Sequence, residues 1–291
     1  MISLDVIAQR ISETTASPYV IAESWSVGGG CINQAMKISD GSRGYFVKIN
    51  QASLLPMFEA EAAALDELAA SNTVRVPLPV CLGVAGSQCF LVLEYLDLSG
   101  SANMAQLGQQ LAAMHRICSR QYGWWRNNTI GSTPQINDLK ADWVSFWQQH
   151  RLGYQLQLAT KQGYGGELQR LGEQLMTRMS GLFDGYQPRP SMLHGDLWGG
   201  NAAGLADGTP VIFDPALYYG DRETDIAMTE LFGGFGGRFY AAYHEAWPLD
   251  AGYSTRKTFY NLYHVLNHLN LFGGGYQGQA LDMMRRLLAE I

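Results

Sequence analysis

The feature that most constrains this chain is the stretch Leu193–Asn201, LHGDLWGGN, together with the later stretch Phe213–Ala216, FDPA. Asp196 is followed five positions later by Asn201, and Asp214 lies thirteen positions beyond that asparagine. A carboxylate at the first position can accept the proton of an attacking hydroxyl. An amide oxygen and a second carboxylate are hard ligands of the kind that magnesium prefers. Asp196 fits the first role, and Asn201 and Asp214 fit the second.

This spacing is typical of a kinase catalytic loop and its metal-binding aspartate. Short pieces of the pattern are common for other reasons, because Asp-Gly and Gly-Asn pairs occur in turns and Asp-Pro often begins a loop. The full combination is more specific, since Asp214 also follows the apolar run Pro210–Phe213, which has the pattern of a buried strand. We therefore predict that Asp196 is catalytic and that Asn201 and Asp214 hold a metal ion.

Length and composition indicate a globular protein. The chain has 291 residues, which is enough for one large domain or two ordinary ones. Apolar residues make up 47% of the chain and charged residues 16%, so disorder is not expected. The net charge of −6 argues against nucleic acid as the main partner, because binding to phosphates needs a basic surface.

Three features bear on localisation. The first ten residues contain Asp5 and no long apolar run, so they do not resemble a signal peptide. The uncharged run 76–93 is long enough to suggest a membrane span, but its prolines and glycines favour two strands around a turn. The four cysteines lack zinc-binding spacing, which favours reduced thiols. We expect a cytoplasmic protein without a membrane segment.

Hydrophobic periodicity divides the chain into two parts. The first part predicts a helix, three strands, a helix and two strands, at residues 3–14, 22–27, 32–38, 45–49, 56–70, 80–84 and 90–94. Helical patterns dominate after the linker-like residues 99–101, at residues 104–117, 138–158, 166–182, 224–231, 238–247, 256–272 and 279–289. We predict an α+β, bilobal, protein-kinase-like fold, with a small antiparallel β-sheet lobe for nucleotide binding at 1–97 and a larger, mainly helical lobe at 98–291.

A nucleotide site is predicted in the first lobe. Gly28, Gly29 and Gly30 join the first two strands, where glycine lets the backbone close over phosphates, although hairpins use glycine as well. Lys48 lies within the apolar strand pattern 45–49 and is costly to bury alone. In a kinase this lysine contacts the α- and β-phosphates and pairs with a glutamate on a helix, whereas the alternative is a lysine that faces solvent.

Two glutamates compete for the pairing role. Glu61 shares a helical stripe with apolar residues, whereas Glu59 lies on a more polar side, so helix spacing favours Glu61. Position alone assigns residues 94–96 to the hinge, where backbone groups of a kinase bind adenine. The residues of this predicted hinge are Glu94, Tyr95 and Leu96.

With these motifs in hand, the sequence resembles the fructosamine kinase (ketosamine-3-kinase) family, which shares the protein-kinase-like fold with aminoglycoside phosphotransferases and choline kinases. The resemblance covers nearly the whole chain. It rests on residues 28–33, 57–61, 194–201, 218–223 and 268–273. Trp198 is the most discriminating position, because the catalytic loops of many aminoglycoside and choline kinases carry a different residue there.

The resemblance implies ATP- and Mg²⁺-dependent phosphorylation of a sugar hydroxyl of a ketosamine. The acceptor would be a fructosamine or ribulosamine, free or protein-bound, and decomposition of the phosphate ester would free the amine, which is a deglycation reaction. Lys48, held by Glu61, would orient the phosphates, and Asp196 would accept the proton of the hydroxyl.

Several roles stay open at this stage. Trp198 could stack on the sugar or pack the loop. A charged cluster favours an ion-pair network bracing the catalytic loop, with substrate contact as the alternative, and its members are Asp221, Arg222, Glu223 and Asp225. Cys31, at the expected phosphate loop, could form an oxidation-sensitive thiol or be a small neutral loop residue.

Alternative functions also stay open. The nearest one is an aminoglycoside- or choline-type phosphotransferase of the same fold, and a different class is a non-catalytic nucleotide-binding module. A protein kinase is disfavoured, because no Ala-Pro-Glu motif follows Asp214. The sequence does not distinguish a monomer from a dimer.

Overall fold

The computed structural model describes residues 2–28 and 33–291, which fold into two compact units. Unit 1 comprises residues 1–103 together with 202–215, and unit 2 comprises residues 104–201 together with 216–291. The chain therefore passes from one unit to the other three times. Within the described residues, no helix is long and apolar enough to cross a membrane.

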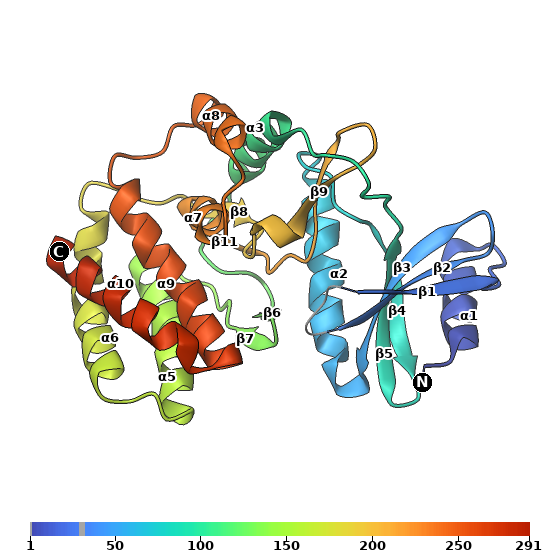
Figure 1. The fold of residues 1–291 in the computed structure, drawn as a ribbon, viewed down its shortest axis with the longest axis horizontal. Coiled ribbons are helices and arrows are strands. Elements are labelled where there is room, and N and C mark those ends of the chain that lie inside the picture. Colours follow the sequence, from blue (N-terminus) through green and yellow to red (C-terminus); the bar gives the residue numbers. More distant parts are fainter. Residues whose placement is uncertain (1, 29–32) are drawn as a thin grey trace. The chain divides into compact units, whose positions relative to one another are not determined.

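Unit 1 is built on a five-stranded antiparallel sheet with the order β1-β2-β3-β5-β4 (Figure 1). Its strands are β1 (Glu23–Val27), β2 (Gln34–Ser39), β3 (Gly44–Gln51), β4 (Pro79–Ala85) and β5 (Gln88–Glu94). The helices are α1 (Leu4–Thr15) and α2 (Leu55–Ala70), which is preceded by the 3₁₀ turn Ala52–Leu54. The uncharged run 76–93 thus forms two strands around a turn, as predicted.

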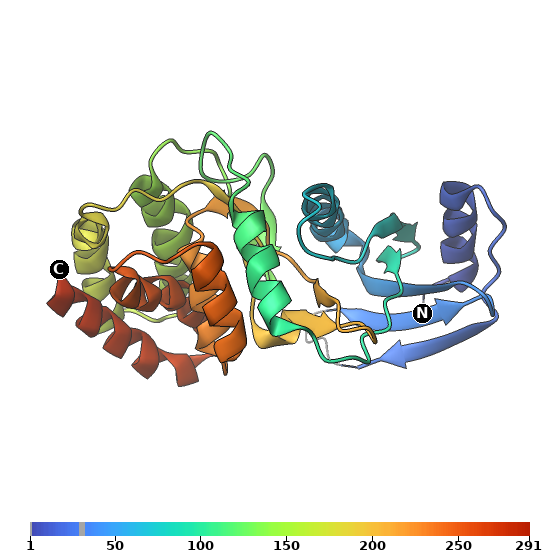
Figure 2. The ribbon, with the colours of Figure 1, turned by 90° about the horizontal axis from the view of Figure 1, so that it is seen from above.

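The helix α1 packs on the sheet because its apolar residues repeat at helical spacing. Figure 2 shows α1 lying over one face of the sheet. Ile7 and Ile11 are fully buried in one apolar cluster with Ile38 of β2 and Val47 of β3. Side chains alternate between the two faces of a strand, so Lys48, between Val47 and Ile49, projects from the opposite face.

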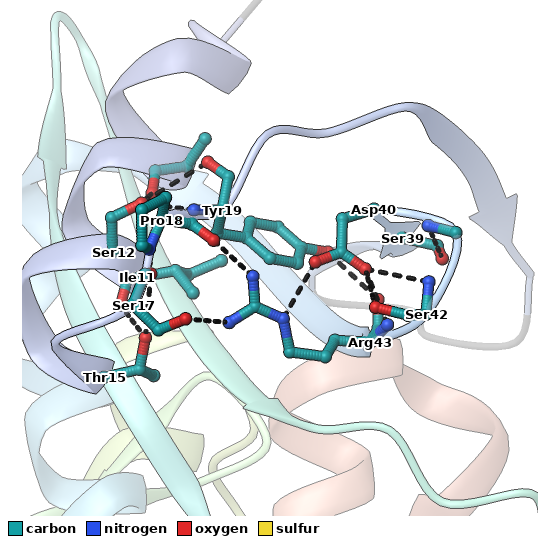
Figure 3. Close-up of polar contacts among 12 residues, drawn as sticks. Ile11, Ser12, Thr15, Ser17, Pro18, Tyr19, Ser39, Asp40, Ser42 and Arg43 are labelled. Carbon is teal, nitrogen blue, oxygen red and sulfur yellow. Dashed lines mark hydrogen bonds and ion pairs between the residues drawn. The ribbon is translucent and has the colours of Figure 1, made fainter.

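The turn between β2 and β3 is tied to the segment that follows α1 (Figure 3). Asp40 accepts hydrogen bonds from the backbone amides of Ser42 and Arg43, and its other oxygen binds the Arg43 guanidinium at 2.8 Å. Arg43 also donates to Ser17 Oγ at 3.1 Å and to the carbonyl oxygen of Pro18. The backbone amide of Arg43, with these other donors, holds the pKa of Asp40 well below its usual range.

A hairpin from later in the chain completes unit 1. It consists of β9 (Ala202–Gly204) and β10 (Pro210–Ile212). The amide of Ile212 donates to the carbonyl oxygen of Arg75, and the amide of Gly100 donates to that of Gly204. These bonds join the hairpin to the first hundred residues, and Asp214 follows two residues after β10.

Unit 2 is mainly helical. Its helices are α3 (Met104–His115), α4 (Trp143–Trp147), the π-helix Gln148–Leu152, α5 (Gly153–Lys161), α6 (Glu167–Arg178), α7 (Glu223–Leu231), α8 (Gly237–Ala246), α9 (Tyr253–Phe272) and α10 (Gln277–Glu290). Short 3₁₀ turns cover Met179–Phe183, Gly199–Asn201 and Gly274–Tyr276. Two small antiparallel pairs join β6 (Asn128–Ile130) to β7 (Thr133–Gln135) and β8 (Ser191–Leu193) to β11 (Tyr218–Gly220). The long helices α9 and α10 run side by side (Figure 1).

The helix predicted at residues 138–158 is wrong in two respects. It begins only at Trp143, where the Asp142 carboxylate accepts the Ser145 amide and caps the first turn. A π-helical turn then interrupts it, and a β-carbon at Gly153 would lie 2.3 Å from the carbonyl oxygen of Gln148. This wider turn buries Arg151 completely.

Candidate active site

Three of the predicted site residues meet in unit 1. Lys48 on β3 places its Nζ 2.5 Å from Glu61 Oε1 on α2 and 2.5 Å from Asp214 Oδ1. The structure thus brings Glu61 to the lysine, as the helix spacing predicts. The Lys48 and Glu61 side chains are about one tenth exposed, whereas the Asp214 side chain is 48% exposed. The cluster therefore presents a carboxylate to solvent above a buried ion pair.

Electrostatics keep this lysine charged. Burial alone would lower the pKa of Lys48, but the carboxylates of Glu61 and Asp214 outweigh burial and raise it above its ordinary value. Asp214 adopts a left-handed backbone conformation with φ of 58°, which aspartate tolerates better than most residues. The fixed ammonium and this exposed carboxylate are the groups that a metal–phosphate complex needs.

The remaining residues of the predicted nucleotide site lie at other places in unit 1. Gly28 follows β1 and is exposed, while Gly29, Gly30 and Cys31 lie outside the described residues. Glu94 ends β5, where its amide donates to the Leu78 carbonyl oxygen at 2.9 Å and its carboxylate pairs with Arg75.

The predicted hinge continues from Glu94 into exposed chain. The Tyr95 ring lies 3.9 Å from Lys37 Nζ, in a cation–π contact, and Leu96 is half-buried. Backbone recognition of a base leaves no mark on side chains, so the hinge assignment of residues 94–96 stays a prediction.

Unit 2 carries the predicted catalytic loop. The Asn201 side-chain nitrogen donates to the backbone oxygen of Asp196 at 2.9 Å and to its Oδ2 at 3.3 Å. The loop is closed further by the Trp198 amide, which donates to the Asp196 carbonyl oxygen at 3.1 Å. Because the Asn201 nitrogen binds Asp196, its carbonyl oxygen is the atom through which it could hold a metal ion.

A buried carboxylate of the charged cluster that follows Asp214 anchors the catalytic loop, as the bracing interpretation of that cluster predicts. Asp225 on α7 accepts the backbone amides of His194 at 2.7 Å and Gly195 at 2.9 Å, and it also accepts His115 Nε2 at 3.1 Å. Burial alone would raise the pKa of Asp225, but these donors, His115 foremost, lower it below its ordinary value. Asp225 therefore stays ionised and holds the two residues that precede Asp196.

His115 binds Asp225 and was not predicted from the sequence. It is fully buried on α3, and burial lowers its pKa, so the ring is neutral. A neutral ring that donates from Nε2 to Asp225 must accept at Nδ1, and Tyr243 OH lies 2.8 Å from that nitrogen. A single histidine in a helical pattern gives no sequence signal for such a role.

The three candidate substrate residues have different environments. Trp198 is 39% exposed, and its indole covers Gly200, where a β-carbon would lie 2.2 Å from the ring. Asp221 is buried and accepts the hydroxyls of Tyr260 at 2.5 Å and Tyr186 at 2.9 Å. Glu223 is fully buried and binds both Nε and an Nη of Arg256. The geometry of Asp221 and Glu223 favours the bracing interpretation over substrate contact.

The predicted site residues thus form two groups, Lys48–Glu61–Asp214 in unit 1 and Asp196–Asn201 in unit 2. A charged lysine held by a helix glutamate, an exposed aspartate and an Asp-x₄-Asn loop define a phosphotransferase with a protein-kinase-like fold. The family model for fructosamine kinase matches residues 3–290, and the chain belongs to this family. It is therefore an enzyme of the ketosamine-3-kinase family, whose members transfer phosphate to an alcohol acceptor.

Individual relatives agree with this assignment. The chain is 49% identical to a probable ketoamine kinase of Synechocystis over 97% of its own length and 96% of the relative's. It is 43% identical to the chloroplastic protein-ribulosamine 3-kinase of indica rice, over 89% of this chain and 77% of the relative. A crystal structure of a candidate fructosamine-3-kinase from Haemophilus somnus aligns with a TM-score of 0.89 at 32% identity, over 97% of this chain and 96% of that one.

A more distant structure shows the fold alone. A choline kinase from Streptococcus pneumoniae aligns with a TM-score of 0.65 at 14% identity, over 99% of both chains. The predicted α+β, kinase-like fold class is confirmed by these neighbours and by the five-stranded antiparallel sheet.

Proposed function

We propose that this enzyme uses ATP and Mg²⁺ to phosphorylate a sugar hydroxyl of a ketosamine, either a fructosamine or a ribulosamine. The observation that carries the proposal is the pairing of Asp196 with Asn201 in a loop anchored by Asp225, because a fixed carboxylate is what an attacking hydroxyl requires. Relatives named as ketoamine and protein-ribulosamine kinases support the class of acceptor.

The donor atoms present fit a magnesium ion. The Asn201 carbonyl oxygen and the exposed Asp214 carboxylate are hard oxygen ligands, and magnesium is commonly bound by one or two protein carboxylates together with substrate phosphates. A bound magnesium ion would neutralise phosphate charge. Within residues 2–28 and 33–291, no group of three or more His, Cys, Asp or Glu side chains is arranged to bind a metal.

Each residue then has a defined task. Lys48, kept charged by Glu61, binds phosphate oxygens, while the Gly28–Gly30 loop closes over the phosphates and residues 94–96 bind adenine. Asp196 accepts the proton of the sugar hydroxyl as the hydroxyl oxygen attacks the γ-phosphorus of ATP, and the bond from that phosphorus to the bridging oxygen of ADP breaks, so that ADP leaves. Trp198 stacks on the sugar carbons. Catalysis is mainly positioning of the reacting groups and neutralisation of charge. Later decomposition of the phosphate ester frees the amine.

The decisive experiment measures ADP formation from Mg-ATP with ribulose-lysine and fructose-lysine, beside kanamycin and choline. Asp196→Asn should lower turnover at least about a thousandfold while leaving ATP affinity within about threefold, because the amide cannot accept the proton. Asp207→Asn is the matched control, since Asp207 is exposed and accepts the backbone amide of Thr209 in its own turn.

The outcomes separate the candidate functions. Turnover of ketosamines alone, lost in Asp196→Asn, supports the proposal. Turnover of kanamycin or choline alone would instead favour the aminoglycoside- or choline-type phosphotransferase. ATP binding without turnover of any acceptor would favour a nucleotide-binding module.

Cell fractionation would test the proposed cytoplasmic location, which the chloroplastic rice relative does not share.

A further inference from the structure

A buried polar cluster of unit 2 binds the chain segment that packs against the catalytic loop. We name it the amide cluster, and its members are Asn128, Gln135, Asn137, Arg151 and Tyr263. All five side chains are buried, with Gln135 1% exposed and Arg151 fully enclosed. Buried polar groups are costly unless they are hydrogen-bonded, so the partners of this cluster indicate what it does.

Two members of the amide cluster bind the backbone of residues 216 and 217, where the chain enters unit 2 after Asp214. Gln135 Nε2 donates to the carbonyl oxygen of Ala216 at 3.0 Å, and Asn128 Nδ2 donates to that of Leu217 at 2.8 Å. Asp214 is separated from this anchored point by Pro215 alone, and proline fixes its own φ.

Ala216 in turn packs against the catalytic loop. Its amide donates to the carbonyl oxygen of His194 at 2.9 Å. Gly195 has a φ of +83°, and a β-carbon there would lie 2.1 Å from the Ala216 carbonyl oxygen. The Ala216 carbonyl oxygen, which Gln135 binds, therefore lies against Gly195, the residue immediately before Asp196. Only glycine allows so close a contact at this position.

The other members of the amide cluster fix the orientation of the Gln135 side chain. Tyr263 OH donates to Gln135 Oε1 at 2.9 Å, so the amide nitrogen must point toward Ala216. Asn128 Oδ1 accepts from both Gln135 and Asn137, at 2.9 Å each. Arg151 donates to Asn137 Oδ1 at 2.8 Å, and its guanidinium lies 4.1 Å from the centre of the Tyr218 ring.

We propose that Gln135 is a positioning residue for phosphoryl transfer. Its amide nitrogen fixes the Ala216 carbonyl, and through Ala216 it fixes the backbone of His194 and Gly195, so that Asp196 is held at one place. The inference rests on the proposed function for the role of Asp196. Because reacting groups that move by about 1 Å lose about a hundredfold in rate, loosening this contact should lower kcat.

The test replaces Gln135 by methionine, which keeps the length of the side chain and removes its hydrogen bonds. Gln169→Met is the matched control, since Gln169 Nε2 also donates to two carbonyl oxygens, those of Leu156 at 3.1 Å and Tyr164 at 2.9 Å. Gln135→Glu is the second variant, because it keeps the acceptor for Tyr263 and, when ionised, cannot donate to Ala216.

Two measurements decide the outcome. We expect kcat to fall at least about tenfold in Gln135→Met, and in Gln135→Glu at pH values where the new carboxyl group is ionised, with KM for ATP and for the acceptor within about threefold, whereas Gln169→Met keeps the wild-type kcat. Hydrogen exchange of peptides within residues 192–219 should be faster in the Gln135 variants alone. A kcat within twofold of the control, or unchanged exchange, would overturn the proposal.

The exchange measurement also separates this inference from the proposed function. If the wild-type enzyme phosphorylates no ketosamine, the proposed function fails. Faster exchange in the Gln135 variants would still support their hold on the loop, and unchanged exchange would still refute it.

Discussion

At the scale of single residues, buried charged and polar side chains hold the candidate catalytic residues in place. Lys48 and Glu61 meet because strand alternation and helical spacing fix where each side chain points. Asp225 accepts a backbone amide of the catalytic loop, His115 binds Asp225, and Gln135 donates to Ala216, which packs against that loop. The charge pattern of residues 221–225 indicated a bracing role for Asp225, whereas no local pattern marks His115 or Gln135, because the partners of those two side chains are set only when the chain folds.

Buried histidines should make the enzyme sensitive to acid. Burial lowers the pKa of His264 to about 3, while an unfolded histidine titrates near 6.5. Below about pH 6.5 the unfolded state therefore binds the proton that the folded state refuses, so stability falls as the pH falls toward 3. Between pH 7 and 5, wild type should lose about 2 kcal/mol more of its free energy of unfolding than His264→Gln.

Urea unfolding at each pH measures this difference. The exposed His244 provides the control, and His244→Gln should keep the wild-type slope of stability against pH. Parallel curves for wild type and His264→Gln would contradict the assignment of acid sensitivity to this buried ring.

At the scale of elements, the predictions were best where periodicity is strong. The seven elements expected before residue 97 all occur within about two residues of their predicted bounds. The π-helix Gln148–Leu152 and the β6–β7 hairpin were missed, since a π turn depends on local packing at Gly153 and three-residue strands carry too few residues for a pattern. Three of the five members of the amide cluster, Asn128, Gln135 and Arg151, lie on these two missed elements, so the cluster was not predictable from periodicity.

Two glycines in helices of unit 2 should respond to alanine in opposite ways. Gly108 of α3 lies so close to α8 that a β-carbon would be 2.4 Å from the Phe239 carbonyl oxygen. Gly108→Ala should therefore lower the free energy of unfolding by about 1–3 kcal/mol. Gly278 of α10 faces open space, so Gly278→Ala should raise it by up to about 1 kcal/mol.

Denaturant unfolding of the two variants beside wild type tests the packing of α3 against α8. Equal effects of both substitutions would show that the helices separate easily and that the close approach at Gly108 is not constrained.

At the scale of the whole molecule, the chain does not divide at a single point. The sequence predicted lobes at 1–97 and 98–291, and this division stays a prediction. In the structure, residues 202–215 belong to unit 1 although they are flanked by unit 2. This assignment depends on long-range bonds such as that from Ile212 to Arg75, which linear periodicity cannot reveal.

Nucleotide binding should stabilise the protein only when magnesium is present. At about 100 times its dissociation constant, Mg-ADP should add about 3 kcal/mol to the free energy of unfolding and raise Tm by a few degrees. EDTA should remove most of this increase, and Asp214→Asn should behave like EDTA, whereas Asp207→Asn should not. Thermal unfolding with and without Mg-ADP tests the role of Asp214, and a full Tm increase in Asp214→Asn would refute it.

The three crossings of the chain between units bear on how such enzymes can be recombined. Lys48 and Asp214 touch each other but lie 166 positions apart in the sequence, and residues 104–201 of unit 2 lie between them. A chimaera that exchanges one contiguous block between two relatives at residue 97 would take Lys48 from one parent and Asp214 from the other. Functional hybrids therefore require crossover points that take residues 202–215 and the first hundred residues from the same parent.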